Sequence, residues 1–306
     1  MIERYLLRYF LAVIDSGTFT AAAAQMAVSQ PTLSAGIAKL EREVGAKLLR
    51  RSSQRIELTE AGSQFAVHAR RIEREFNLAA AAVGGIAQPA TLRLGVLTTI
   101  ASGELAVLVA RIAADAPGLA VELVEGNATV LAQQLARGRV DLALTAVQGD
   151  AAGDGEALRS EPYLLALPVG HRLAGEAALP GEALAGETMI VRRSCEALPE
   201  TSRYFTRRGI RPSFALRTPN DDRALAMVAA GLGATVVPAS HRHAGVANPA
   251  LIGFDLRRTL VLVRGEDARE GMAAVVDAVR GVFGGRKDIG QRVESRRDNQ
   301  DGAGGL

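Results

Sequence analysis

The sequence predicts an α/β protein in three successive parts: a small helical N-terminal domain, a long linker helix and a two-lobed α/β domain. Two short helices with good capping residues fit into the first 45 residues. From 65 to 83 an apolar repeat alternates spacings of four and three, which is typical of one long helix. Beyond Pro89, strand-like and helix-like segments alternate. At 306 residues, the chain is long enough for two or three domains.

The first predicted helix spans the apolar run from 5 to 14. Arg8 interrupts this run, which argues against a signal-peptide core, and the apolar residues recur at helical spacing. They are Ile2, Leu6, Phe10 and Ile14. We therefore expect the first helix of a folded domain.

Two short helices separated by a tight turn follow. Thr18 is a suitable N-cap for a helix that runs through the alanines to Met26. Ser29 is the N-cap of the next helix, and Pro31 falls in its first turn. This arrangement is a helix-turn-helix.

The second of these helices has one apolar and one polar side. Its apolar stripe consists of Leu33, Ile37, Leu40 and Val44. The opposite side carries Pro31, Ala35, Ala38, Lys39 and Arg42, with Thr32 and Ser34 on the flank. Such a helix could lie in a DNA major groove with its first turn near base edges. An ordinary amphipathic surface helix has the same periodicity, so periodicity alone leaves both interpretations open.

A longer match distinguishes the two interpretations. The matching segments are Arg8-Tyr9-Phe10, Val28-Ser29-Gln30-Pro31, Lys39-Leu40-Glu41, Val44-Gly45, Leu48-Leu49-Arg50-Arg51 and Leu58-Thr59-Glu60-Ala61-Gly62. In order and spacing, about sixty residues resemble the N-terminal domain of LysR-type transcriptional regulators. The resemblance implies sequence-specific binding to double-stranded DNA, with residues 48 to 58 forming a two-stranded wing.

The recognition helix departs from the family pattern at two positions. Ala35 and Gly36 stand where family members often carry Arg and Gln, so a long side chain for bidentate contact with guanine is missing. We expect short side chains, wing arginines and DNA shape to contribute more to recognition. Gly36 suggests close approach of a neighbouring backbone. The predicted DNA-binding residues are Thr18, Thr20, Ser29, Gln30, Pro31, Thr32, Ser34, Ala35, Lys39, Arg50, Arg51, Ser53 and Arg55.

Charge and composition agree with a DNA-binding protein. The formal net charge is +3, and residues 1 to 58 hold eight Lys or Arg against five Asp or Glu. The basic excess therefore lies in the DNA-binding segment, although a solvated surface of this charge is also ordinary. A single cysteine excludes an internal disulfide, and no stretch is long and apolar enough to span a membrane. We expect a cytoplasmic protein.

The long helix has a heptad seam made of Phe65, Ala69, Ile72, Phe76, Ala79 and Val83. A single helix folded back on its own domain has the same pattern. In the LysR family this segment pairs subunits, so the resemblance implies a homodimer that presents two reading heads. Gly84-Gly85 and Pro89 predict a hinge after the helix.

Two α/β sets follow the hinge. In the first, Leu92–Leu97, Ala120–Glu125 and Val140–Ala146 are predicted strands, with helices around Gly103–Ala116 and Thr129–Arg137. In the second, the strands are Tyr163–Val169, Thr188–Arg192, Ser213–Arg217 and Ala234–Pro238, with helices near Glu200–Arg208 and Arg223–Ala230. Late segments Thr259–Arg264 and Met272–Phe283 would return to the first set. This alternation predicts βαβ units in mainly parallel sheets, and two lobes leave a ligand cleft. The resemblance implies an effector-binding domain similar to periplasmic solute-binding proteins.

Candidate effector-binding residues follow the predicted strands. They are Thr98, Thr99, Ile100, Ser102, Asn127, Thr129, Thr145, Arg193, Ser194 and Cys195. Free N–H groups and hydroxyls after the first strand suit a small anionic effector of unknown identity. Each residue taken alone is also an ordinary cap or turn residue.

Other chemistry is weakly supported. Cys195 lies near the position of the reactive cysteine in peroxide-sensing relatives, but it has no second cysteine as resolving partner. His241 and His243 lack further ligands at metal-site spacing, so no metal or cofactor is expected. The three lysines lie outside the α/β region, and no Gly-x-Ser-x-Gly elbow occurs, so the sequence does not indicate an enzyme. A transport protein would have no use for residues 1 to 62.

We therefore expect four segments: a DNA-binding domain (1–59), a linker and dimerisation helix (60–88), an effector-binding domain (90–285) and a disordered tail (286–306). Lobe I comprises about 90–162 and 265–285, and lobe II about 163–264. The expected partners are double-stranded DNA, a small-molecule effector and further copies of the chain as a homodimer or homotetramer. RNA polymerase is a further candidate partner.

Overall fold

The computed structural model describes residues 1–51, 56–84, 91–149, 153, 155–265 and 271–285. The chain divides into two units. Unit 1 comprises Met1–Leu97, Pro117–Leu144 and Arg264–Met272, and unit 2 comprises Thr98–Ala116, Thr145–Val263 and Ala273–Leu306. Each is described by itself. The predicted tail and most of the predicted hinge lie outside the described residues.

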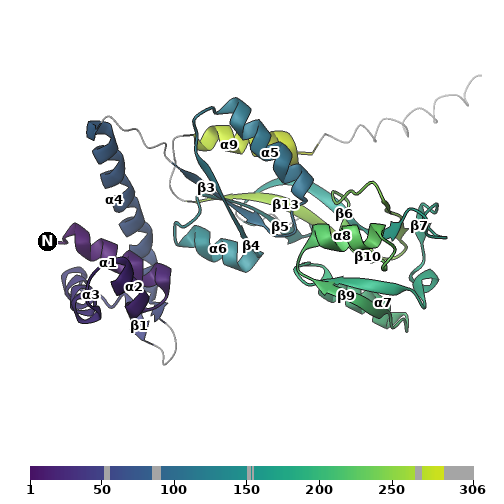
Figure 1. The fold of residues 1–306 in the computed structure, drawn as a ribbon, viewed down its shortest axis with the longest axis horizontal. Helices are drawn as coiled ribbons and strands as arrows, with labels where there is room; N and C mark the ends of the chain where they lie inside the picture. The colour runs from purple at the N-terminus through teal and green to yellow at the C-terminus, as the bar shows by residue number, and fades with distance from the viewer. Residues whose placement is uncertain (52–55, 85–90, 150–152, 154, 266–270, 286–306) are drawn as a thin grey trace, which may run out of the picture. The chain divides into compact units, whose positions relative to one another are not determined.

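Unit 1 begins with the predicted helix-turn-helix and wing (Figure 1). Its elements are α1 (Arg4–Ser16), α2 (Phe19–Gln25), α3 (Gln30–Val44), β1 (Leu49–Arg51), β2 (Ile56–Leu58) and α4 (Glu60–Gly84). The antiparallel pair β1–β2 confirms the wing. The core of this domain joins Leu6 and Phe10 of α1, Leu33 and Leu40 of α3, and Ala66 of α4, all fully buried.

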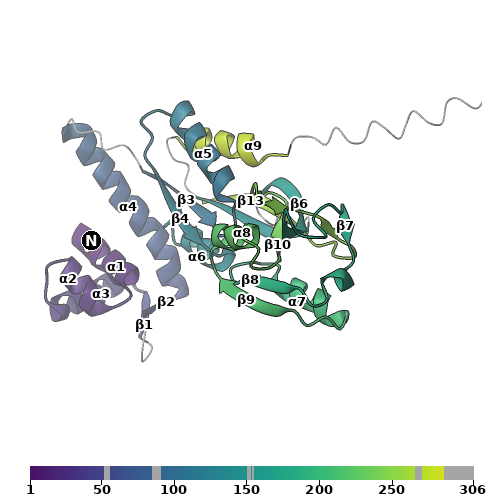
Figure 2. The ribbon, with the colours of Figure 1, turned by 45° about the vertical axis from the view of Figure 1, so that its right-hand side comes forward.

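The helix α4 continues beyond the part that packs on α1. In both ribbon views, the three short helices gather around one half of α4 and the other half extends past them (Figure 2). Ile72 and Phe76 of the predicted seam are 41% and 48% exposed. The side chain of Val83 lies outside the described residues. The chain therefore leaves an apolar stripe of α4 in solvent.

The remaining strands of unit 1 form a parallel set. They are β3 (Leu92–Leu97), β4 (Val121–Gly126) and the first part of β5 (Leu142–Gln148), with α6 (Ala128–Ala136) between β4 and β5. β3 pairs with β4 and with β5 in parallel register. This confirms the predicted βαβ units of the first set.

Unit 2 contains the second set. Its main elements are α5 (Ser102–Asp115), β6 (Glu156–Pro168), β8 (Thr188–Arg192), α7 (Leu198–Arg207), β9 (Ser213–Thr218), α8 (Asp221–Ala229), β10 (Thr235–Pro238), β13 (Arg257–Arg264) and α9 (Met272–Phe283). Short pieces complete it: β7 (Ala178–Leu179), a 3₁₀ turn (Gly181–Leu184), β11 (Val246–Ala247) and β12 (Ala250–Leu251). β8 and β9 are parallel, as predicted.

The long strand β6 differs from the prediction. It begins seven residues before Tyr163, and it pairs antiparallel with β10, β11 and β13. Pro162 lies within β6 although proline cannot donate a ladder hydrogen bond. In the structure, the Pro162 carbonyl accepts from Ala239 N at 2.9 Å, so the strand continues through the proline.

Two hydrophobic clusters form the core around β8 and β10. One includes Met189, Phe205 and Val236, and the other includes Ile190 and Leu225. Since α7 contributes to the first and α8 to the second, the two helices cover opposite faces of these strands. Among the described helices, none has both the length and the apolar character needed to cross a bilayer.

Candidate DNA interface and effector site

The recognition helix α3 begins as predicted. Ser29 Oγ accepts a hydrogen bond from the backbone nitrogen of Thr32 at 3.3 Å, and it lies 2.7 Å from Thr32 Oγ1. Pro31 lies in the first turn, and Gly45 ends the helix in the left-handed region at φ 76°. Thr18 caps α2 by accepting from Ala21 N at 3.2 Å. These caps fix where both helices of the motif start.

The first turn of α3 is open to solvent. Gln30, Pro31, Thr32 and Ala35 are exposed, and Ser34 is half-buried. Thr20 is exposed on α2. The opposite stripe is buried as predicted, with Leu33 and Leu40 fully buried and Ile37 nearly so. The first turn of α3 is therefore accessible from solvent.

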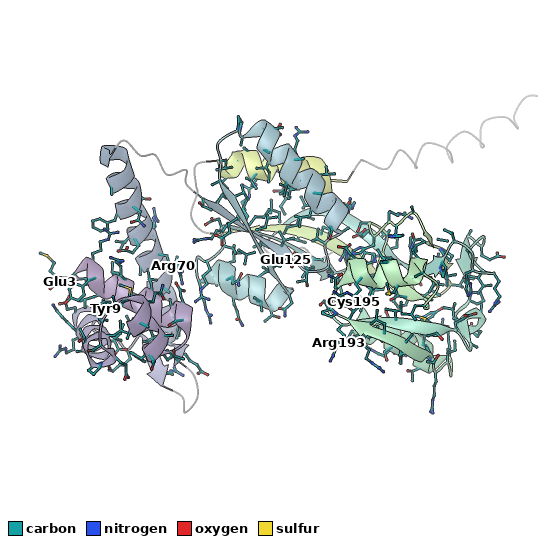
Figure 3. The ribbon with its side chains drawn as sticks, in the orientation of Figure 1. Glu3, Tyr9, Arg70, Glu125, Arg193 and Cys195 are labelled. Atoms are coloured by element: carbon teal, nitrogen blue, oxygen red, sulfur yellow. The ribbon has the colours of Figure 1, made fainter. Side chains whose placement is uncertain are left out.

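The prediction for Gly36 was wrong about its neighbour. A Cβ atom at Gly36 would lie 2.7 Å from Cδ2 and 3.1 Å from Cε2 of Tyr9. The ring of Tyr9, rather than a backbone segment, therefore requires glycine here. Tyr9 is buried in α1 and packs edge-on against Tyr5 with a centroid distance of 5.4 Å. Figure 3 labels Tyr9 within this helical domain.

Lys39 has a partner within the domain. Its Nζ donates to Glu3 Oε1 at 2.7 Å and lies 5.8 Å from the Tyr5 ring centroid. A DNA phosphate would have to compete with this solvent-accessible ion pair, whose contribution to the free energy of folding is small. Arg50 is exposed on the wing. Ser53 and Arg55 lie outside the described residues, and so does the side chain of Arg51.

Glu41 holds the wing to the recognition helix. Its Oε1 accepts from the backbone N–H of Leu48 at 3.0 Å and of Leu49 at 3.2 Å, and its Oε2 accepts from Lys47 Nζ at 2.7 Å. Burial alone would raise the pKa of Glu41, but these bonds lower it below its ordinary value. Sequence reasoning placed Glu41 in a motif without assigning it a role.

The predicted effector residues differ in exposure. Thr99 is fully buried, Ile100 is buried and Thr98 is half-buried, while Ser102 is exposed at the start of α5. In unit 1, the Asn127 side chain caps α6 by accepting from Val130 N at 2.9 Å, and Thr129 is exposed. Thr145 Oγ1 is buried without a hydrogen-bond partner among the described residues.

The predicted residues after β8 lie on the loop that leads into α7. Figure 3 labels two of them, Arg193 and Cys195. Arg193 is exposed, Ser194 is half-buried and Cys195 is 9% exposed. Burial raises the pKa of the Cys195 thiol, although nearby Arg192 opposes this. A neutral thiol is a poor nucleophile, so its surroundings do not activate it.

A cluster of hydrogen-bonding residues lies next to Thr99, and sequence reasoning missed it. Arg258 of β13 is fully buried and donates from Nη1 to the Thr99 carbonyl, the Thr99 hydroxyl and Glu196 Oε1, at 3.0, 3.1 and 2.7 Å. Its Nε donates to Glu161 Oε1 at 2.8 Å. Tyr163 Oη donates to Glu196 Oε1 at 2.8 Å. The available signal was that Arg258 lies just before the apolar part of β13, where a charged side chain is buried only with partners.

A second buried ion pair supports α8. The Arg192 Nε donates to Asp221 Oδ1 at 2.8 Å, its Nη2 donates to Asp221 Oδ2, and its Nη1 donates to the Val236 carbonyl at 2.9 Å. His241 Nε2 lies 3.3 Å from Asp221 Oδ2. Burial alone would raise the pKa of Asp221, but attraction to His241 and Arg192 lowers it to about 2. This pair ties β8, α8 and β10 together.

A cavity of about 540 Å³ lies between α7 and the strands β8, β9 and β10. Its lining is mainly apolar and includes Met189, Cys195, Leu198, Phe205 and Val236. Its volume falls in the range of small-molecule sites.

Comparisons with known proteins agree with this architecture. A family model described as bacterial regulatory helix-turn-helix protein, lysR family, matches residues 5–63, and one described as LysR substrate binding domain matches residues 87–284. A probable hydrogen peroxide-inducible genes activator of Mycobacterium avium is 34% identical over 239 residues, covering 76% of this chain and 77% of that protein.

Two solved structures share the fold of most of the chain. The full-length OxyR of Pseudomonas aeruginosa with a cysteine-to-aspartate substitution has a TM-score of 0.62 at 22% identity, covering 92% of this chain and 95% of the other. The full-length CbnR in complex with target DNA has a TM-score of 0.54 at 26% identity, covering 92% of this chain and 99% of the other.

Proposed function

Because the chain belongs to the LysR family of DNA-binding transcriptional regulators, we propose that α3 and the wing read its operator and that a small effector biases this binding. The exposed first turn of α3, capped by the Ser29 side chain, is the observation that carries the proposal. The relatives are regulators, so we assign no enzymatic activity.

The reading surface uses short side chains. Gln30 and Thr32 are long enough to hydrogen-bond base edges, and Ala35 can contact a thymine methyl group. Arg50, together with Arg51 and Arg55 of the wing, would reach phosphates or a narrow minor groove. The other residues of this surface are Thr18, Thr20, Ser29, Pro31, Ser34, Lys39 and Ser53.

The exposed stripe of α4 supports pairing of subunits. Ile72 and Phe76 are large apolar side chains of α4 that are 41% and 48% exposed, and the guanidinium carbon of Arg4 lies 4.7 Å from the Phe76 ring centroid. Covering them with a second α4 would remove them from water and bring two reading heads to a two-fold related operator. We propose a homodimer that assembles further into a homotetramer and contacts RNA polymerase. In this proposal, residues 1–59 bind DNA, residues 60–88 pair the subunits and residues 90–285 bind the effector.

The effector acts on residues 90–285. A ligand changes DNA binding only if it binds two arrangements of the regulator with different affinity. The peroxide-linked names of relatives raise thiol oxidation as an alternative signal, but the burial and raised thiol pKa of Cys195 favour a reversibly bound small molecule. Treatment with hydrogen peroxide should therefore change operator affinity no more in the wild type than in Cys195→Ser. A larger change of operator affinity in the wild type than in Cys195→Ser would instead support thiol oxidation as the signal.

The test of the reading surface is a binding-site selection with the full chain and two arginine variants. Ala35→Arg should shift the preference toward guanine at one position of each half-site, because arginine binds guanine O6 and N7 together. Ala38→Arg, also exposed on α3, should raise affinity without changing the preferred sequence. Identical preferences in both variants would show that α3 is not placed as proposed, and failure of the wild type to select any sequence would refute the function itself.

A further inference from the structure

Three hydrogen-bond donors converge on the carboxylate of Glu196. Arg258 Nη1 lies 2.7 Å and Tyr163 Oη 2.8 Å from Oε1, and Thr99 Oγ1 lies 2.9 Å from Oε2. The three donors come from β13, β6 and the segment after β3, whereas Glu196 lies on the loop between β8 and α7. This is the donor pattern expected around a bound carboxylate ligand.

The charges around Arg258 leave no place for another anion. One guanidinium faces two carboxylates, because Glu161 Oε1 accepts from Nε at 2.8 Å while Glu196 accepts from Nη1. An anion added beside them would be buried without a positive partner, which is costly. With Glu196 removed, one added carboxylate would restore the wild-type arrangement of one guanidinium and two carboxylates.

One donor of the guanidinium is still unused. Nη2 of Arg258 is buried and has no hydrogen-bond partner among the described residues. Arginine can bind both oxygens of a carboxylate in parallel, and Glu196 uses only Nη1. A free carboxylate could engage Nη1 and Nη2 together, which the tethered Glu196 does not do.

We propose that Thr99, Tyr163 and Arg258 form a binding site for a carboxylate group and that Glu196 is its built-in occupant. The assignment deepens the proposed effector function and rests on it. As a tethered competitor, Glu196 acts at an effective concentration on the order of millimolar or above, so simple carboxylates are excluded from the wild-type site. An effector that takes this position must displace Glu196, and the loop before α7 then loses its attachment to Arg258, Tyr163 and Thr99.

The test is chemical rescue of the full chain in Glu196→Ala. Removing the carboxylate leaves Arg258 and the two hydroxyls without their acceptor, so the melting temperature measured by calorimetry should fall. Sodium acetate should then raise the melting temperature of the variant in a saturable way. The apparent affinity for acetate should be at least about tenfold higher for the variant than for the wild type. Acetamide, the neutral isostere, and sodium chloride at equal ionic strength should not raise the melting temperature in this way.

Two control variants define the site. Glu200→Ala removes a half-buried carboxylate in the first turn of α7, which accepts from Arg203 Nη2 at 2.7 Å, and this variant should gain no response to acetate. Adding Thr99→Val to Glu196→Ala should weaken the acetate effect. If Glu196→Ala does not fold, its refolding yield in acetate against acetamide becomes the readout, with the same expectation.

Absence of an acetate effect, or an equal effect of acetamide, would overturn the proposal. Operator binding by the wild type is measured separately. A negative acetate result would therefore refute the carboxylate site but not the regulatory function. A wild type that binds no operator would refute the regulatory function, whatever the acetate result.

Discussion

Replacing Asp221 by asparagine should strongly destabilise the domain that contains α8. Asp221 is 8% exposed, and its carboxylate is the ionic partner of Arg192, which is 2% exposed. Removing one member of a buried pair leaves the other charge uncompensated, at a cost of about 3–5 kcal/mol. For a domain of roughly 200 residues, this corresponds to a melting temperature lower by roughly 6 to 20 °C.

The neighbouring residue provides a matched control. Asp222 also lies in the first turn of α8, but it is exposed and accepts from the Ser102 hydroxyl at 2.5 Å. Asp221→Asn and Asp222→Asn lose the same favourable charge at the helix N-terminus, about 0.3–1 kcal/mol. The difference between the two variants in calorimetry therefore measures the pairing with Arg192.

The pH dependence of this difference has a definite sign. The folded pKa of Asp221, about 2, lies below the ordinary aspartate value of 3.8. Its contribution to stability is therefore fully present above the unfolded value and is lost as the pH falls through about 2. The gap between wild type and Asp221→Asn should stay constant from neutral pH down to about 4 and narrow below it. Equal melting temperatures for the two asparagine variants at neutral pH would refute the reasoning.

Three further outcomes follow from the N-terminal domain. Gly36→Ala should destabilise it by up to about 2 kcal/mol, because overpacking against Tyr9 exceeds the gain in helix propensity, and adding Tyr9→Leu should relieve the loss in thermal melts. Glu41→Gln should cost about 1–3 kcal/mol at neutral pH and less in acid, since the folded pKa is lowered, whereas exposed Glu43→Gln should be silent in urea titrations. Phe76→Ser should weaken self-association roughly ten- to a hundredfold in sedimentation equilibrium, and an unchanged association constant would place the subunit contact elsewhere.

Local signals predicted the helix and strand framework well. Thr18 and Ser29 cap the helices that they were expected to cap, because an N-cap interacts within three residues of chain. Leu92–Leu97 and Thr188–Arg192 were predicted with the bounds that the structure has. Each forms a parallel pair with the strand that follows the next helix.

Contacts between distant segments could not be predicted in the same way. Glu196 and Arg258 are 62 residues apart, and Thr99 and Arg258 are 159 apart. No periodicity links such positions, because their proximity depends on how whole strands pair. The ring beside Gly36 escaped prediction for the same reason: the need for a small residue was visible, but the identity of its neighbour on another helix was not. The assignments of individual residues to DNA or to effector remain predictions.

The single cysteine of the chain gives access to the kinetics of the loop before α7. Cys195 precedes Glu196 directly, lines the cavity beneath α7 and is buried. A thiol reagent should react faster when this loop opens, so a change in its rate of reaction reports a change in loop opening. Because the chain contains no other cysteine, the loss of free thiol follows this one event without mutagenesis. Comparing the rate with and without operator DNA would show whether occupancy of α3 changes the opening of a loop more than 150 residues further along the chain.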